Sequence, residues 1–378
     1  VYNDGSFKLN HEFFDYRTGL KMINKKFEKL FDLPTKNPNE NFTEKYIDIA
    51  KSIQNITEDI SIGLVKRAKD LTESDNLCMA GGVALNCVSN TKIYNRKIFE
   101  NIWIQPASGD AGTALGAALL FYYNHTNKEK KLSRFNVYSG CNYQTDEIEI
   151  ALKNAKIEKF SSLDNERLCK TIAMELSEQN AVGWFQGRME FGPRALGSRS
   201  ILADPRPKDM QSRLNIKIKY RESFRPFAPS VLKEHINEFF HEKIDNPHML
   251  FICNLKDKYK STDQIKYQGL EKLKHVNNEI TSISHVDNTA RVQSVSKEDN
   301  ELYYNLINEF YNITNVPMII NTSFNIRGEP IVASPSDAIR CFLGTDLDIL
   351  VMNNYIIYKK DIPNKIKNKN YQNEFEKD

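Results

Sequence analysis

The sequence predicts an α/β protein of two domains. Short apolar segments alternate with amphipathic helical segments along most of the chain, which is the pattern of sheets covered by helices. The 378 residues exceed what one ordinary hydrophobic core holds, so two domains are expected. A content of 40% hydrophobic and 27% charged residues is globular and excludes collagen-like and wholly disordered chains.

The first third of the chain is expected to contain two short strands, each followed by a helix. Apolar residues at helical spacing, short apolar runs and an Ala/Gly-rich segment predict helices over 44–69, 83–94 and 110–123 and strands over 76–80 and 102–105. The polar, charged residues 124–132 then predict a linker.

The alternating pattern restarts after this linker. Helices are expected over 145–155, 164–178 and 301–313 and from Pro335, and strands over 181–185, 285–295 and 317–321. Ser334 suits a helix cap, because Pro is favoured in the first turn that follows. The lysine-rich residues 254–278 predict a surface insertion, and the Lys/Asn-rich residues 361–378 predict a frayed polar tail.

Charge and cysteine content exclude several classes of function. The 52 basic and 49 acidic residues nearly balance, which argues against a protein built mainly to coat nucleic acid. No apolar run approaches the roughly 18 residues that a membrane span needs. Six cysteines without a CxxC pair indicate reduced thiols and a cytoplasmic location. Neither nucleic acid nor a membrane is therefore an expected partner.

Gly81 and Gly82 end a predicted strand just before a helix. Glycines at this position let backbone N–H groups approach an anion, and Asn86 could hydrogen-bond a ribose or phosphate. A tight strand–helix turn explains the two glycines equally well. Asp110 similarly opens a predicted helix, where a carboxylate could bind a metal or simply cap the helix.

Arginines and glycines alternate in the segment 183–206. The arginines are Arg188, Arg194, Arg199 and Arg206, and the glycines between them are Gly187, Gly192 and Gly197. A solvated arginine-rich face would not need these glycines. The pattern favours a phosphate clamp in which backbone and guanidinium groups both contact oxygen atoms.

Two further segments carry side chains suited to phosphate. Lys219, Arg221 and Arg225 are two and four residues apart, so on an extended segment they would share one face and attract an anion such as a triphosphate. Ser323 and Asn325 follow an apolar strand and could hold a phosphate or a metal-bound oxygen, although a turn completed by Gly328 also explains them.

His285 lies in a segment that alternates like a strand. Asp287 and Arg291 would share its face. The imidazole has the right chemistry for acid–base catalysis, while a structural role is the alternative.

These motifs occur together, and in this order, in a known family. AGGVALN, PASGDAGTALGAA, GRMEFGPRALGSRSILADPR, KYRESFRPFAPS, HVDNTARVQSV and NTSFNIRGEPIV resemble the NodU/CmcH-type O-carbamoyltransferases from about residue 4 to about residue 358. The resemblance implies the second lobe of an actin-like (ASKHA) domain over residues 1–133. It implies a YrdC-like domain over 134–360, followed by a polar tail over 361–378.

The resemblance also implies a reaction. The YrdC-like domain would convert carbamoyl phosphate and ATP, with Mg²⁺, to carbamoyl-adenylate, and the actin-like domain would transfer the carbamoyl group to a hydroxyl of a small molecule such as a sugar or secondary metabolite. The family's Lys-x-Arg and Ser-x-Asn signatures are matched by Lys219–Arg221 and Ser323–Asn325.

Roles for individual residues follow from the same resemblance. Catalysis is assigned to Lys219, Arg221, Arg225 and His285. Nucleotide or carbamoyl phosphate binding is assigned to Arg188, Gly192, Arg194, Gly197, Arg199, Ser323, Asn325, Gly328, Glu329, Gly81, Gly82 and Asn86.

The sequence departs from the family pattern at its metal site. Asp110 matches one ligand of a metal that the family usually holds as iron, but the HxxxH pair of the other ligands is absent. We therefore expect the chain to be a C-terminal portion of a longer carbamoyltransferase, with iron bound only if that pair is supplied. Two alternatives are an enzyme of the tRNA threonylcarbamoylation type and a non-catalytic nucleotide-binding remnant.

Overall fold

A computed structural model describes residues 1–2, 5–37, 40–126, 135–275, 279–368 and 370–376. The chain divides into two compact units. The first comprises Val1–Met79 and Val88–Trp103, and the second comprises Ala80–Cys87 and Ile104–Lys377. Most of the expected linker, and the expected domain boundary at 133, lie outside the described residues, so that boundary stays a prediction.

The first unit is built around one long helix and a two-stranded sheet. Its elements are α1 (Lys25–Phe31), α2 (Glu44–Thr72), β1 (Asn76–Met79), α3 (Cys87–Asn95) and β2 (Asn101–Ile104). A small core of Val65, Ile93 and Phe99 holds α2 and α3 together. The expected helix over 83–94 is divided, because a 3₁₀ turn over Gly82–Leu85 precedes α3.

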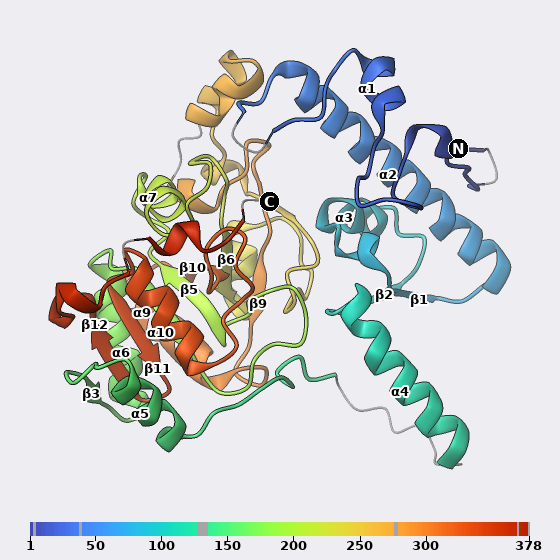
Figure 1. The fold of residues 1–378 in the computed structure, drawn as a ribbon. Helices are drawn as coiled ribbons and strands as arrows, with labels where there is room; N and C mark the ends of the chain where they lie inside the picture. The colour runs from blue at the N-terminus through green and yellow to red at the C-terminus, as the bar shows by residue number, and fades with distance from the viewer. Residues whose placement is uncertain (3–4, 38–39, 127–134, 276–278, 369, 377–378) are drawn as a thin grey trace. The chain divides into compact units, whose positions relative to one another are not determined.

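The second unit contains a mixed sheet of eight strands, shown in Figure 1. The strands are β3 (Ser161–Ser162), β4 (Val182–Phe185), β5 (Arg199–Ala203), β6 (Ala228–Leu232), β9 (Gln293–Val295), β10 (Met318–Ser323), β11 (Ile349–Met352) and β12 (Tyr355–Tyr358). Their order is β3-β12-β11-β4-β5-β10-β6-β9. β10 lies inside the sheet and pairs antiparallel with β5 and β6.

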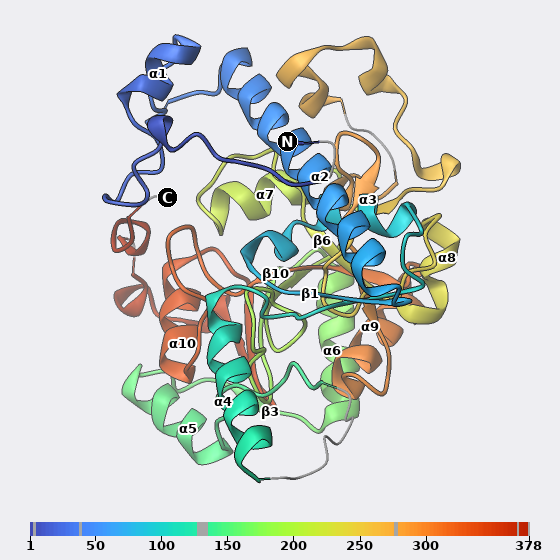
Figure 2. The same cartoon turned by 90° about the vertical axis from the view of Figure 1, so that its right-hand side faces the viewer.

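Helices cover both faces of this sheet (Figure 2). They are α5 (Thr145–Asn154), α6 (Asn165–Ser177), α7 (Met210–Lys217), α8 (Ile236–Phe239), α9 (Glu301–Thr314) and α10 (Pro335–Gly344). α6 and α9 share one hydrophobic core with the sheet, while α5, α7 and α10 contribute to the other. On β10, Ile319 belongs to the first core and Ile320 to the second, as the two-residue period of a strand requires. The predicted α/β class is confirmed.

Local sequence signals explain where these helices begin. Asp164 accepts a hydrogen bond from the Arg167 N–H at the start of α6. Ser334 and Asp337 form a capping box around Pro335 at the start of α10, as expected from the sequence.

Three expectations about local structure are wrong. Residues 285–295 do not form one strand, because Asp287 accepts hydrogen bonds from Thr289 and closes a turn before β8 (Thr289–Ala290), which pairs with β7 (Cys253–Asn254). Residues 219–225 form a loop, since Tyr220 has a left-handed φ of 50°. Residues 361–378 are not frayed over their described part, because the Tyr371 side chain is fully buried.

The described part of the lysine-rich segment 254–278 forms short 3₁₀ turns over Asp257–Tyr259, Asp263–Lys266 and Gly269–Lys274. It is anchored to the domain, because the ring of Tyr259 stacks on Phe239 with centroids 4.7 Å apart.

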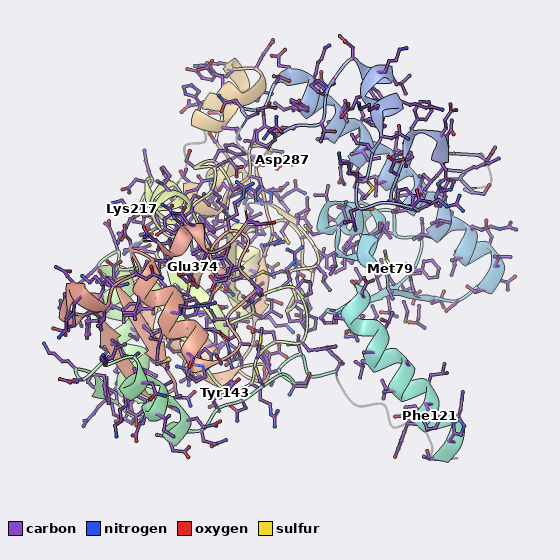
Figure 3. The ribbon with its side chains drawn as sticks, in the orientation of Figure 1. Met79, Phe121, Tyr143, Lys217, Asp287 and Glu374 are labelled. Atoms are coloured by element: carbon purple, nitrogen blue, oxygen red, sulfur yellow. The ribbon has the colours of Figure 1, made fainter. Side chains whose placement is uncertain are left out.

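α4 spans Asp110–Thr126 and confirms the predicted Ala/Gly-rich helix. Its large apolar residues Leu119, Leu120, Phe121 and Tyr122 are exposed, and Phe121, labelled in Figure 3, has 64% of its surface accessible. No helix in the described ranges combines the length and the apolar character needed to cross a membrane.

Candidate functional site

A cavity of about 410 Å³ lies at the C-terminal end of β10, in the second unit. Strand β10 contributes Asn321, Thr322 and Ser323 to its wall. The other lining residues are Cys87, Pro193, Arg194, Ala195, Arg221, Arg225, Pro226, Phe227, Ala228, Met249, His285 and Arg291. Four of the lining residues are arginines and none carries a carboxylate, so the wall is strongly basic.

Protein partners orient three of these arginines. Arg194 donates to the carbonyl of Leu85 at 3.5 Å. Arg221 donates from Nε to Asn215 Oδ1 at 2.7 Å, and its guanidinium lies 5.1 Å from the ring centroid of Phe227. Arg225 pairs with Glu222 at 3.1 Å. These contacts hold the guanidinium groups at the cavity wall, oriented to donate hydrogen bonds to the oxygen atoms of an anion.

The fourth arginine, Arg291, is the least compensated. Its Nε atom is buried and has no hydrogen-bond partner, and the same is true of Arg194 Nε. Burial, followed by repulsion from Arg194, lowers the pKa of Arg291 to about 10. Because buried guanidinium donors are costly to leave unpaired, this arrangement favours binding of an anion with several oxygen atoms.

The Lys219 ammonium joins the two segments that the sequence analysis connected. Its Nζ donates to Asn325 Oδ1 at 2.8 Å, to Asn325 O at 2.9 Å, and to the carbonyl of Ser323. Ser323 Oγ also donates to Asn325 Oδ1 at 2.6 Å. Lys219 is buried behind Ser323, which lines the cavity. Burial, and secondarily the charge of Arg221, lower the pKa of Lys219 to about 7.

A buried polar network supports the strand side of the cavity. Asn321 Nδ2 donates to Ser230 Oγ at 3.0 Å and to Gln293 Oε1 at 2.9 Å. Tyr303 donates to Ser230 Oγ at 2.8 Å, and Gln293 donates to the Leu196 carbonyl at 2.9 Å. This network ties β10, β6 and β9 together beneath the arginines.

His285 lines the cavity from the turn before β8. Its Nδ1 lies 2.9 Å from Thr289 Oγ1. Burial lowers the pKa of His285 below its usual value; the Asp287 carboxylate opposes this shift and Arg291 adds to it. The imidazole is therefore held mainly neutral at pH 7, as a proton acceptor requires.

Two residues assigned to binding by sequence have structural partners inside the domain, and their role in binding stays a prediction. Arg199 is fully buried and donates to the carbonyls of Gln186, Ser198, Gly187 and Cys141 while stacking on Phe185. Gly197 has a φ of 104°, and a Cβ there would lie 2.4 Å from the Tyr303 ring. Neither residue lines the cavity.

The remaining predicted residues of the second domain also lie outside the cavity wall. Arg188 is exposed and donates to the Gly140 carbonyl at 3.1 Å. Gly192 lies beside the Pro106 carbonyl. Gly328 and Glu329 form the turn after Asn325, and Glu329 accepts from the Ile326 N–H at 2.8 Å. Their roles in binding stay predictions.

The glycine loop and Asp110 lie in the first third of the chain. Gly81 has a φ of 98°, Gly82 begins the 3₁₀ turn, and Asn86 ends it. Asp110 begins α4 and is exposed. No group of three or more His, Cys, Asp or Glu side chains with metal-binding geometry occurs among the residues described. Iron binding at Asp110 with a histidine pair supplied from elsewhere stays a prediction.

Several residues of the cavity carry no binding signal of their own in the sequence patterns. These are Cys87, Phe227, Met249, Asn321 and Thr322, and Arg291 stands out only as a neighbour of His285 on the expected strand. Asn321 and Thr322 directly precede Ser323, so continuing the strand pattern backward would have found them.

The fold and the cavity define an α/β protein with a strongly basic cavity at the end of a central strand. The family described as carbamoyltransferase N-terminus matches residues 1–119, and that described as carbamoyltransferase C-terminus matches residues 173–359. The chain belongs to the carbamoyltransferase family.

Named relatives come from several bacteria. An uncharacterised protein of Synechocystis is 44% identical over 99% of this chain and 62% of its own length. Nodulation protein NolO of Bradyrhizobium diazoefficiens is 39% identical over 84% of this chain and 56% of its own. The 3'-hydroxymethylcephem-O-carbamoyltransferase of Streptomyces clavuligerus is 29% identical over 72% and 46%. The chain thus spans about half the length of the relatives it matches.

Proposed function

We propose that this chain carries the ATP-dependent activating step of an O-carbamoyltransferase. The observation that carries the proposal is the basic cavity, which has four arginines, no carboxylate in its wall, and two buried guanidinium Nε atoms without partners. Carbamoyl phosphate and ATP are both polyanions, and clustered guanidinium groups would offset the repulsion between them.

The proposed chemistry has two steps at this site. Water first converts carbamoyl phosphate to carbamate and phosphate. A carbamate oxygen then attacks the α-phosphorus of Mg²⁺-bound ATP, the bond to the bridging oxygen breaks, and pyrophosphate leaves. The product is carbamoyl-adenylate, in which the carbonyl carbon carries a good leaving group. Holding both reactants in one cavity supplies the effective concentration for this attack.

Each predicted catalytic residue has a position suited to a role. Arg221 and Arg225 would bind phosphate oxygens, with Arg194 and Arg291 beside them. His285, held mainly neutral, would accept the proton of the attacking water. Lys219 would support the site through Ser323 and Asn325, and an arriving polyanion would favour its charged form.

The subsequent transfer would place the carbamoyl group on a hydroxyl of a small molecule. The cephem relative, whose name specifies a hydroxymethyl acceptor, supports this class of substrate. No step of this proposal involves iron, since the described residues around Asp110 do not form a metal site. A cytoplasmic location is part of the proposal, and it is supported by the six cysteines, which form no disulfide in the described part of the chain.

The test is carbamoyl-phosphate-dependent formation of AMP and pyrophosphate from ATP by the purified chain. We expect turnover that falls by about one to two orders of magnitude in Lys219→Ala and Arg221→Ala. Arg167→Ala is the matched control and should retain full activity, because Arg167 is exposed, pairs with Asp164 at the start of α6 and does not line the cavity.

Two outcomes would contradict the proposal. One is ATP binding without any AMP formation when carbamoyl phosphate is present, which is the behaviour of a non-catalytic remnant. The other is AMP formation that depends on threonine and bicarbonate instead, which would assign the chain to the tRNA threonylcarbamoylation type.

A further inference from the structure

The C-terminal segment 360–376 lies beyond the residues matched to the family and packs into the core of the second unit. Tyr371 is fully buried there, with Phe375 at a ring-centroid distance of 5.4 Å. Glu374, labelled in Figure 3, marks the same segment. Burial of a tyrosine on this scale does not occur in a tail that serves only as a solvated extension.

One set of contacts leads from Tyr371 to the Lys219 ammonium. The Tyr371 hydroxyl donates to Glu329 Oε1, and Glu329 Oε2 accepts from the Ile326 N–H at 2.8 Å. The Glu329 carbonyl accepts from Asn325 Nδ2 at 2.6 Å. The amide of Asn325 is thereby oriented with Oδ1 toward Lys219 Nζ, 2.8 Å away.

A second set of contacts leads from Tyr371 to the loop between Lys219 and Arg221. The Tyr371 ring packs so tightly on Gly344 that a Cβ at Gly344 would lie 2.2 Å from its Cγ atom. The Gly344 carbonyl in turn accepts from the Tyr220 hydroxyl at 3.0 Å. Tyr220 holds the left-handed turn from which Lys219 and Arg221 project.

We infer that Tyr371 is a positioning residue, which holds Lys219 and Arg221 in place through Glu329 and Gly344. The two routes start at different parts of one side chain, the hydroxyl and the ring, and end on the same three-residue loop. The effect on turnover rests on the proposed function, whereas the effect on Lys219 itself rests only on these contacts.

The experiment compares Tyr371→Phe with a matched control, Tyr358→Phe. Tyr358 also donates from a partly buried hydroxyl to a carboxylate, that of Glu175 at 2.9 Å, but it does not contact the Lys219 loop. The first readout is a short pulse of acetic anhydride followed by peptide mass spectrometry. Acetylation of Lys219 is measured relative to that of Lys233, whose ammonium is partly exposed and paired with Asp245.

Tyr371→Phe should raise the relative acetylation of Lys219 several-fold, because loss of the hydroxyl loosens Glu329 and Asn325 and admits the reagent. Carbamoyl-phosphate-dependent AMP formation should fall about 10-fold at saturating ATP, the effect of one charge-assisted hydrogen bond. The double variant Tyr371→Phe/Glu329→Gln should form AMP no more slowly than Glu329→Gln alone, since both changes break the same route through Glu329. Tyr358→Phe should change neither readout.

Unchanged Lys219 acetylation in a folded Tyr371→Phe protein would overturn the inference. Rates of AMP formation by Tyr371→Phe that match those of Tyr358→Phe would overturn it as well. If Tyr371→Phe does not fold, Glu329→Gln carries the same comparison. A wild-type chain without turnover would contradict the proposed function and leave the acetylation result to decide the positioning role.

Discussion

Replacing Arg291 with methionine should stabilise the ligand-free protein and weaken its binding of polyanions. The guanidinium is crowded by Arg194 and Arg221, and its buried Nε has no partner. Met has a similar length and no charge, so Arg291→Met removes the repulsion and leaves only a small change in packing.

The size of the effect follows from the pKa of Arg291, which burial and its neighbours lower to about 10. Each pKa unit corresponds to about 1.4 kcal/mol, so keeping this side chain charged costs the folded state at most about 3.5 kcal/mol. The arginine is charged in the unfolded chain at all pH values below its ordinary pKa. The cost is therefore fully present at pH 7–8 and declines as the pH rises above about 10.

The assay is urea unfolding at pH 7.5, paired with calorimetric titration of ATP. Arg291→Met should raise the free energy of unfolding by about 1–3 kcal/mol and weaken ATP binding by about 10- to 100-fold. Arg199→Met is the contrasting control. Arg199 is also a buried arginine of this domain, but four carbonyls accept from it, so its loss should destabilise the fold by about 3 kcal/mol or more. An Arg291→Met protein that is less stable than the wild type would refute the reasoning.

Three other results are expected. Gly197→Ala should cost about 3 kcal/mol or more in urea unfolding, because its Cβ would meet the Tyr303 ring at a positive φ; an unchanged midpoint would contradict this account. ATP binding at pH 7.5 should be accompanied by uptake of roughly half a proton or more, since the bound anion raises the pKa of Lys219 from about 7. Calorimetric titrations in buffers of different ionisation enthalpy measure this uptake, which should vanish in Lys219→Met. Pyrophosphate should raise the melting temperature of the wild type, and 0.5 M salt should reduce the shift, whereas a shift that persists in salt would argue against the arginines.

Sequence reasoning located most helices of the second unit, because their apolar periods are long and strong, but only β4 and β10 among the strands of its eight-stranded sheet. It also connected Lys219 to Ser323 and Asn325 over a separation of more than a hundred residues, and the structure places these groups in hydrogen-bonding distance. That connection came from the family signature. The alternating spacing of Lys219, Arg221 and Arg225 would by itself have placed them on a strand, which the left-handed Tyr220 prevents.

The direction in which an arginine points could not be predicted. Arg194 and Arg199 lie in one motif, yet Arg194 faces the cavity while Arg199 donates to carbonyls inside the domain. The difference depends on how far each residue lies from the start of β5, which a sequence pattern does not resolve to a single residue. Tyr371 was missed for another reason, since its neighbours are polar and its burial depends on contacts with Gly344 and Glu329 far away in sequence.

The position of β10 in the sheet has a consequence for synthesis of the chain. β5 and β6 are made more than eighty residues before β10, and neither pairs with the other in the finished sheet, because β10 lies between them. Until residue 323 leaves the ribosome, both strands carry open edges that can pair with other chains. The same late strand supplies Asn321 and Ser323 to the cavity. A nascent chain that stops short of β10 therefore lacks the strand wall of the cavity, and under the proposed function added nucleotide would protect only the completed chain from aggregation.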